Sequence, residues 1–366
     1  DVSFSAGGFG ARFGDRVSSL TNINLRNGNE ERFGGQLNLS ATGFGVSAEG
    51  PIGNVGSYLV SVRRSYLDFI SKAAGFSFIP EYWDTQIKVN VNLDQKNSLS
   101  FLTIGALDGI SFNNDDADKR FNNSRINGSN QNQYFSGLTW KNLFSTGFFT
   151  VTLGRNFSTF DTRQRDSNLV EIFKNVSTEG ETMLRSDFFF QINPTTELSF
   201  GNNIKFASLL DYQLVIPGYT RLDPNGIPQP LTLDSNFTAL RNGTYASIAS
   251  SLTDNLRHTA GVRLDYYNFL KNTLYFSPRL SLSYSLISTT ALNFSVGRYF
   301  QSPSFIWLMG DKNNAQTLSA IRADQVILGF EQTMQSDLKF QVEGYYKWYG
   351  NYPSRIYRPQ AVLSPS

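Results

Sequence analysis

Long stretches of alternation between apolar and polar residues constrain this sequence more than any other feature. From Gly35 onward the alternation persists for roughly ten positions at a time, which is the period of a β-strand with two different faces. In five such segments the apolar parity consists of Ile87, Val89, Val91 and Leu93; Val262, Leu264 and Tyr266; Leu280, Leu282 and Tyr284; Leu292, Phe294 and Val296; and Leu338, Phe340 and Val342. Each segment is therefore predicted to be a strand with one apolar face and one polar face.

The length of these segments favours a membrane over a soluble core. Strands of soluble sandwiches average roughly 5 to 6 residues, whereas a bilayer requires strands of about 9 to 11. The apolar runs are far shorter than the ~20 residues that a spanning helix needs. The formal net charge of +2 argues against an electrostatic nucleic-acid binder, and a count of zero cysteines excludes disulfides and thiolate metal sites.

Connections that alternate between short and long form a second regularity. The short ones lie at 51–56, 94–97, 145–147, 193–196, 253–255, 287–290 and 335–337, and the long ones near 66–84, 109–132, 157–178, 213–235 and 301–321. In outer-membrane barrels the short turns face the periplasm and the long loops face outside. The pattern predicts about seven hairpins, hence about fourteen strands, between Gly35 and Trp348.

Aromatic pairs stand where strands meet long loops, as at Tyr266-Tyr267, Tyr299-Phe300 and Tyr345-Tyr346. Rings with a polar tip prefer the headgroup level of a bilayer. These pairs are therefore predicted to lie at the membrane interface. Residues 66–76 are predicted to form a short amphipathic helix in the first long loop.

Residues 1–33 have a different character from the strands that follow. They begin with Gly7-Gly8-Phe9-Gly10-Ala11-Arg12-Phe13-Gly14-Asp15-Arg16 and continue with a short strand-like stretch, 20–26. This arrangement resembles the end of the plug domain of TonB-dependent outer-membrane receptors. Gly50-Pro51-Ile52-Gly53, Ser277-Pro278-Arg279 and Leu328-Gly329-Phe330-Glu331 resemble later segments of that family, in the family's order. The sequence departs from the family at Gly10, where Pro is frequent, and at Ile327, where Glu is frequent.

The resemblance implies an all-β fold, a transmembrane antiparallel barrel of 22 strands of which this chain is a part. Residues 1–33 would be the C-terminal end of the plug and residues 34–366 an incomplete barrel. The implied function is import of a scarce nutrient, such as a siderophore, cobalamin, a glycan or a peptide, across the outer membrane of a Gram-negative bacterium. The implied partners are outer-membrane lipid, the TonB energy-transducing complex and the nutrient ligand, and the resemblance leaves open a surface lipoprotein that covers the loops. Neither enzymatic activity nor a cofactor is expected.

Candidate functional residues fall into three groups. Outer-loop residues that could contact a ligand are Tyr82, Trp83, Tyr219, Arg221 and Trp307, with membrane anchoring as the competing interpretation for the aromatic ones. Candidates for contact between plug and barrel are Arg12, Arg16 and Arg63. Charged residues on the polar parity, expected to contact the plug or water, are Lys88, Arg263, Asp265, Lys339 and Glu343.

Two other functions compete with the receptor hypothesis. A self-contained fourteen-strand channel, similar to the fatty-acid transporters, would use residues 1–33 as a small hatch. An outer-membrane hydrolase would need His258, the single histidine, together with a nucleophile and an orienting group, and no such trio is evident. Asn114, Asp116 and Asp118 have the alternate spacing of a calcium loop, but Lys119 stands where that loop needs Gly. No metal site is therefore predicted.

Overall fold

The computed structural model describes residues 1–222, 225, 227–309, 313–335 and 338–353. The chain divides into two compact units, which are treated separately below. The first comprises Asp1, Ile23–Ile192 and Ser199–Asn242, and the second comprises Val2–Asn22, Asn193–Leu198 and the described residues from Gly243 onward. None of the described helices is both long enough and apolar enough to cross a membrane.

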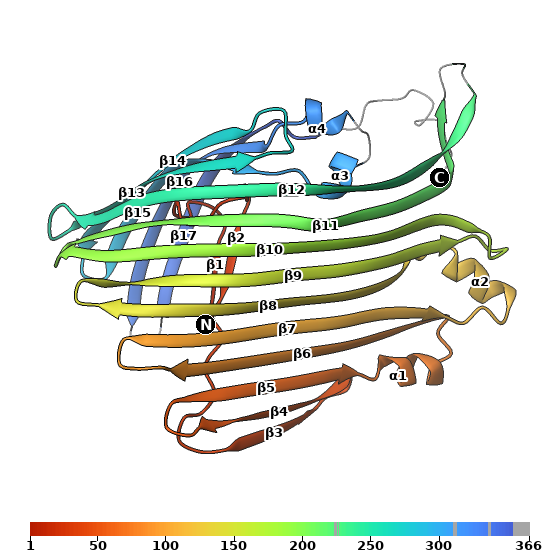
Figure 1. Ribbon diagram of the computed structural model, residues 1–366, viewed down its shortest axis with the longest axis horizontal. Coiled ribbons are helices and arrows are strands. Elements are labelled where there is room, and N and C mark those ends of the chain that lie inside the picture. Colours follow the sequence, from red (N-terminus) through yellow and green to blue (C-terminus); the bar gives the residue numbers. More distant parts are fainter. Residues whose placement is uncertain (223–224, 226, 310–312, 336–337, 354–366) are drawn as a thin grey trace. The chain divides into compact units, whose positions relative to one another are not determined.

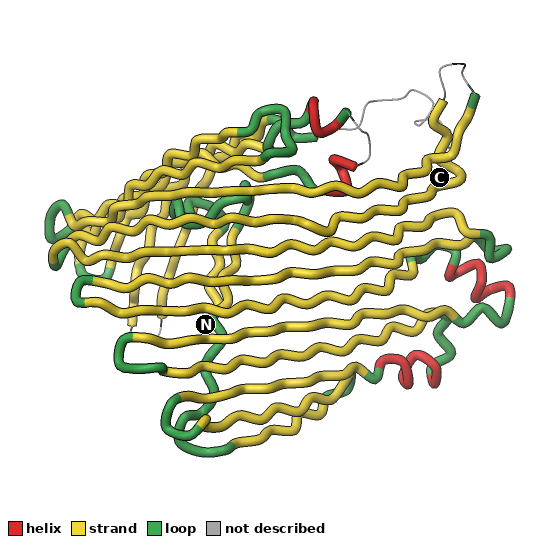
Figure 2. Tube along the Cα trace, viewed as in Figure 1, coloured by secondary structure: helices red, strands yellow, loops and turns green. Residues whose placement is uncertain are grey.

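Strands dominate both units, and Figures 1 and 2 show the strands with the short helices near their ends. The first unit contains β3 (Gly34–Leu39), β4 (Gly43–Ile52), β5 (Gly56–Ser65), α1 (Leu67–Ala73), β6 (Phe78–Asn92), β7 (Asn97–Phe112), α2 (Ala117–Asn123), β8 (Gly128–Phe144), β9 (Gly147–Arg165) and nearly all of β10 (Glu171–Asn193). β11 (Thr196–Leu222) and β12 (Pro228–Ser251) contribute residues to both units. The second unit contains β1 (Val2–Ser5), most of β2 (Leu20–Ile23), β13 (Leu256–Tyr267), β14 (Leu274–Ile287), β15 (Thr290–Gln301), α3 (Phe305–Met309), α4 (Asn314–Thr317), β16 (Ile321–Gln335) and β17 (Leu338–Gly350).

Among the described residues, β3 to β17 form one fifteen-stranded sheet in which each strand pairs with its neighbours in sequence. The first six predicted short turns each join two of these strands, from β4–β5 to β14–β15, and the seventh includes residues outside the described part. The helix predicted within 66–76 is confirmed as α1. The strand beyond the predicted fourteen is β3, which pairs with β4 from Gly34 opposite Glu49 to Leu39 opposite Phe44. The alternation predicted from Gly35 onward covers this strand, but the count from seven hairpins omitted it, because none of the seven predicted short turns joins β3 to β4.

Several predicted long loops are wrong in extent because the strands continue through them. β9 runs to Arg165 and β10 begins at Glu171, so most of 157–178 is paired strand, with those two residues opposite each other. In the same way β11 and β12 extend into 213–235, and β6 begins at Phe78 within 66–84. Backbone pairing satisfies N–H and C=O groups whatever the side chains are. The largely polar ends of β9 and β10 can therefore pair as strands without showing an alternation of apolar and polar residues.

On β13 and β14 the apolar faces point outward and the charged residues Arg263, Asp265 and Arg279 are buried, which reverses the arrangement of a soluble protein. In β13, Val262 and Leu264 are 44% and 47% exposed, whereas Arg263 and Asp265 are 5% and 2% exposed. On the next strand Phe276 is exposed and its neighbour Ser277 is buried. An apolar surface that continues across neighbouring strands requires an apolar solvent.

The aromatic pairs only partly follow the prediction. Tyr267, Tyr299 and Phe300 are buried, so their assignment to the membrane interface is wrong, because they pack against other rings rather than project outward. Tyr345 and Tyr346 are exposed. A cluster that the prediction missed joins the short-turn ends of β8 to β11 and contains Trp140, Phe144, Phe149, Phe188, Phe190 and Phe200. Trp140, at one end of this cluster, is 41% exposed.

Candidate functional site: the contact between residues 6–18 and the strand wall

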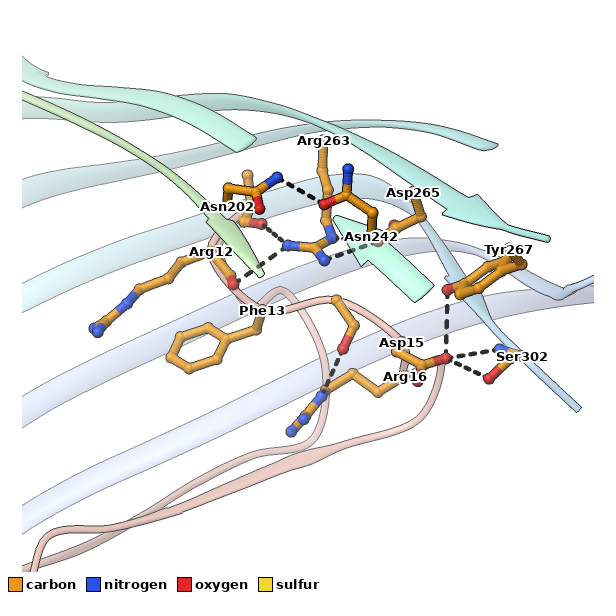
Figure 3. Close-up of polar contacts among 12 residues, drawn as sticks. Arg12, Phe13, Asp15, Arg16, Asn202, Asn242, Arg263, Asp265, Tyr267 and Ser302 are labelled. Atoms are coloured by element: carbon orange, nitrogen blue, oxygen red, sulfur yellow. Dashed lines mark hydrogen bonds and ion pairs between the residues drawn. The ribbon is translucent and has the colours of Figure 1, made fainter. Parts of the chain in front are cut away.

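In the second unit the N-terminal segment packs against the polar face of β13 to β17, and Figure 3 shows part of this contact. We call residues 6–18 the docked segment, and we call the strands whose polar face contacts the N-terminal segment the wall. Gln325, 1% exposed on β16, donates its Nε2 to the carbonyl of Val17 at 2.7 Å. The amide of Val17 donates to Oε1 of Gln301, at the end of β15, at 3.2 Å. Side chains of the wall thus satisfy both backbone groups of one residue.

Arg279 of β14 makes the largest set of contacts with the docked segment. Its Nη1 donates to the carbonyls of Phe9, Gly10 and Phe13 at 3.2, 2.6 and 2.7 Å. The guanidinium carbon lies 4.3 Å from the ring centroid of Tyr299 and 5.3 Å from that of Phe9. Hydrogen bonds from a charged donor are the stronger kind, and stacking on rings replaces part of the water that a buried guanidinium loses.

Arg263 and Asp265 of β13 form a buried ion pair beside the same segment. Arg263 Nε donates to Asp265 Oδ1 at 2.8 Å, and its Nη1 lies 3.4 and 3.5 Å from the carbonyls of Ala11 and Arg12. A β-carbon on Gly14 would lie 2.0 Å from Arg263 Nε. Glycine is therefore required at this position for the segment to approach the ion pair.

Asp15 fixes the turn in the docked segment. Its φ of 57° lies in the left-handed region, which Asp and Asn tolerate better than other non-glycine residues. Its Oδ1 accepts hydrogen bonds from the amide and hydroxyl of Ser302, both at 2.8 Å, and from the hydroxyl of Tyr267 at 3.3 Å (Figure 3). One carboxylate therefore joins the turn to two elements of the wall.

Substitution of Asp15 tests this turn. We expect Asp15→Ala to lose three charge-assisted bonds and to retain an unfavourable φ, which together favour opening of the segment by about 2 kcal/mol, or roughly 30-fold. Hydrogen exchange of the amides in residues 15–18 would report that change. Asp15→Asn keeps an acceptor oxygen and the tolerance for this φ, so its exchange should stay within a few-fold of wild type. Equal exchange in Asp15→Ala and wild type would contradict this role of the carboxylate.

Apolar contacts complete the docking. Phe9, Val17, Leu20, Tyr299, Ile321 and Ala323 form a buried cluster, and Phe13 packs against it. The rings of Phe9 and Tyr299 lie 4.6 Å apart at 59°, a tilted geometry that aromatic pairs favour. On β17, the last strand of the wall, Lys347 Nζ donates hydrogen bonds to the carbonyl of Ala6 and, at 3.1 Å, to that of Ser18.

In the first unit, wall side chains bond residues 23–33 in the same way. Lys88 Nζ donates to the carbonyl of Leu25 at 2.5 Å, and Asn90 Nδ2 donates to Oδ1 of Asn27 at 2.9 Å. Arg26 pairs with Glu49 of β4, Nη2 to Oε1 at 2.9 Å. In both units wall cations bond backbone carbonyls, so the N-terminal segment is held largely through atoms that every sequence possesses.

The expected contact of the polar-parity charges with residues 1–33 is confirmed for two of them, Lys88 and Arg263, and Asp265 forms an ion pair with Arg263. Lys339 forms an ion pair with Glu331 at 2.8 Å, and Glu343 accepts from Gln341. Sequence reasoning missed Arg279, Gln325 and Lys347 as contact residues. Their place on the polar parity was the available signal, but their acceptors are backbone atoms without a sequence signature.

Contact between plug and barrel through Arg12, Arg16 and Arg63 stays a prediction. Arg16 Nε donates to the carbonyl of Gly14 at 3.2 Å, within the docked segment. The carbonyl of Arg12 accepts a hydrogen bond from Arg263. The guanidinium carbon of Arg12 lies 5.9 Å from the centroid of the Phe13 ring. Arg63 pairs with Asp84 on the adjacent strand, with Nε 2.8 Å from Oδ1.

The candidate ligand contacts are spread over several elements. Tyr82 and Trp83 lie in β6, and Arg64 stacks on the Trp83 ring at 5.3 Å. Trp307 lies in α3 and is 46% exposed. Tyr219 and Arg221 lie in β11, at positions whose side chains fall outside the described part. A role of these residues in ligand binding stays a prediction.

The described residues contain no cluster of His, Asp or Glu that could hold a metal ion. Asp116 instead caps α2, where its Oδ1 accepts from the amide of Lys119 at 2.8 Å, and this bond holds the pKa of Asp116 below its ordinary value. His258, the hydrolase candidate, lies half-buried in β13, which begins at Leu256.

Comparison with known proteins decides the family. Residues 66–365 match the family described as TonB dependent receptor-like, beta-barrel. The chain belongs to this family. Its fold is accordingly that of a transmembrane antiparallel β-barrel. No curated protein matches the sequence.

Solved structures agree on the fold at low sequence identity. A variant of the ferric enterobactin receptor PfeA from Pseudomonas aeruginosa is 15% identical with a TM-score of 0.70, over 95% of this chain and 57% of its own. The siderophore receptor PirA from Acinetobacter baumannii is 13% identical with a TM-score of 0.68, over 95% and 57%. The copper transporter OprC is 12% identical with a TM-score of 0.69, over 96% and 59%. This receptor chain therefore spans less than two thirds of the length of these structures.

Proposed function

We propose that this chain forms part of a TonB-dependent receptor that imports a scarce nutrient through the outer membrane of a Gram-negative bacterium. Residues 1–33 would be the end of its plug and residues 34–366 its barrel wall. The observation that carries the proposal is that buried wall residues, chiefly Arg279, bind several backbone carbonyls of the docked segment. Family membership and the outward apolar face support the location and the transport role.

The contact suits a plug that must move without unfolding the barrel. Carbonyls released from Arg279 or Lys347 can bond to water, so each bond can be exchanged as the segment is displaced. The cations stay attached to the wall, where Asp265 continues to stabilise Arg263 and the ring of Tyr299 continues to stabilise Arg279. On this proposal the wall performs no bond chemistry, and the TonB complex supplies the energy. The nutrient is proposed to be a chelated metal, cobalamin, a glycan or a peptide.

The absence of cysteine allows a direct test of plug movement. A β-carbon on Gly261 would lie 2.8 Å from that of Ala11, so a shift of under about 1 Å gives the ~3.5 to 4.5 Å spacing of a disulfide. We expect the double variant Ala11→Cys, Gly261→Cys, placed in the full-length receptor, to import ferric enterobactin or cyanocobalamin only after reduction. Each single variant is the matched control and should import under both conditions.

Uptake should also require TonB and the proton-motive force. It would be measured with labelled ferric enterobactin and cyanocobalamin in cells that lack other receptors for them. Import by the oxidised double variant at the rate of the reduced one would contradict movement of this segment. Import that survives deletion of TonB would contradict the energy-coupled mechanism as a whole.

A further inference from the structure

A cavity of about 170 Å³ lies in the first unit, between the connection that contains α2 and the hairpin of β9 and β10. α2 lies at the long-connection ends of these strands, as Figure 1 shows. Apolar side chains, among them Ile110, Phe112 and Leu169, line part of the cavity. Polar and charged side chains line the rest, so the cavity offers an amphipathic environment to a small molecule.

Asn123, 6% exposed at the end of α2, presents an unused acceptor in this cavity. Its Nδ2 donates to the carbonyls of Ser77 and Asn113 at 3.1 and 2.9 Å and to Oδ1 of Asn114 at 2.9 Å. Its Oδ1 is buried and receives no hydrogen bond from any described residue. A buried acceptor without a donor is costly, and a ligand with an N–H or O–H group would satisfy it.

Two arginines provide free donors at the same cavity. Arg163 is engaged, with Nε 2.7 Å from Asp161 Oδ1 and Nη1 3.3 Å from Glu171 Oε2. The side chain of Arg165 makes no hydrogen bond or ion pair with the described residues, and the side chain of Arg120 makes one bond, from Nη1 to the carbonyl of Asn114 at 3.1 Å. Guanidinium groups with free N–H donors are the groups that bind carboxylates.

The turn that closes the cavity is strained. Leu169 has a φ of 65°, which is unfavourable for a leucine, and its side chain lines the cavity. Asp166 holds this turn, because its Oδ1 accepts from the amides of Asn168 and Val170, both at 2.9 Å. Backbone strain that the surrounding bonds maintain is a feature of ligand sites.

We propose that this cavity binds a compact organic monoanion that has a carboxylate at one end, an apolar body and a hydrogen-bond donor at the other. The carboxylate pairs with Arg165 and Arg120, the apolar body contacts Leu169 and Phe112, and the donor bonds Asn123 Oδ1. Binding rests on the proposed function only in that the long connections face the outside of the cell. It requires neither the docked segment nor the TonB complex.

Three aromatic probes separate these requirements. 4-Hydroxybenzoate carries both polar ends, benzoate lacks the donor, and methyl 4-hydroxybenzoate lacks the carboxylate. Calorimetric titration of the purified protein in detergent should give 4-hydroxybenzoate a Kd below about 1 mM and each analogue at least 10-fold weaker binding. Ester binding equal to that of the acid would mean partition into detergent or apolar surface and would overturn the proposal. So would equal binding of benzoate.

A matched pair of variants locates the site. Arg165→Gln removes a side chain that holds no described contact, so folding should be retained, and we expect it to weaken 4-hydroxybenzoate binding at least 10-fold. Arg257→Gln, an exposed arginine of β13 near a short turn, is the control and should leave binding unchanged. Unchanged binding in folded Arg165→Gln would refute the assignment. Titration of a receptor that is locked against import should match wild type, which separates this site from the transport proposal.

Discussion

Arg279→Ala is expected to release the docked segment while the strands of the wall remain folded. Its guanidinium supplies three bonds to backbone carbonyls, and a charge-assisted bond contributes roughly 1.5 to 3 kcal/mol. Released carbonyls bond to water, so the net loss is about 3 kcal/mol rather than the sum, which is roughly a 100-fold larger opening equilibrium. Hydrogen exchange of residues 9–17 would measure it, because native-state exchange reports local opening free energies.

Arg298→Ala is the matched control for Arg279→Ala. Arg298 lies on β15 and pairs with Asp324, with Nε 2.6 Å from Oδ1, and it is much more exposed than Arg279. An exposed ion pair contributes little to stability, so exchange of residues 9–17 should not change. Arg279→Lys keeps the charge but loses the planar guanidinium that stacks on the rings of Phe9 and Tyr299, and an intermediate exchange rate is expected. Equal exchange in Arg279→Ala and Arg298→Ala would mean that the apolar cluster around Phe9 holds the segment without the arginine.

The sequence was informative wherever structure depends on neighbours along the chain. Alternation has a period of two, so it identified the strand faces, and turn residues identified the hairpins from β4 onward. β3 lies within the predicted alternation but was left out of the count of fourteen strands, because its connection to β4 at 40–42 was not among the predicted short turns. The outer parts of β9 and β10 escaped because they are largely polar and their partners are backbone groups.

The candidate site was harder to predict because its bonds join distant residues through atoms without a sequence signature. Arg279 stood on the polar parity, but its acceptors lie 266 to 270 residues earlier and are carbonyl oxygens. Attention to side chains of residues 1–33 therefore favoured Arg12 and Arg16, whereas the described bonds run from wall side chains to the backbone of the docked segment. Asp15 is the exception, since its carboxylate is itself the acceptor.

We expect Leu328→Arg to lower the free energy of unfolding, and this substitution tests whether the apolar face meets lipid. Leu328 lies in the middle of β16, is 62% exposed, and shares its outward parity with Val326 and Phe330 between the polar residues Asp324 and Gln332. Arginine on the lipid face at the bilayer midplane destabilises a barrel by about 2 to 4 kcal/mol. Urea unfolding in lipid vesicles should show that loss in the free energy of unfolding.

Asn293→Arg provides the comparison on the opposite face. Asn293 lies on β15 opposite Gly329, next to Leu328 in the wall but on the polar parity, where the absence of a side chain at Gly329 leaves room. A charge on this face stays hydrated, so we expect a change within about 1 kcal/mol. If both substitutions destabilise the protein equally, burial within protein rather than contact with lipid covers the apolar face. An exposed leucine on a water-facing surface tolerates arginine. If Leu328→Arg left the free energy of unfolding unchanged, that face would therefore lie in water, and the physical basis of a membrane-spanning wall would be removed.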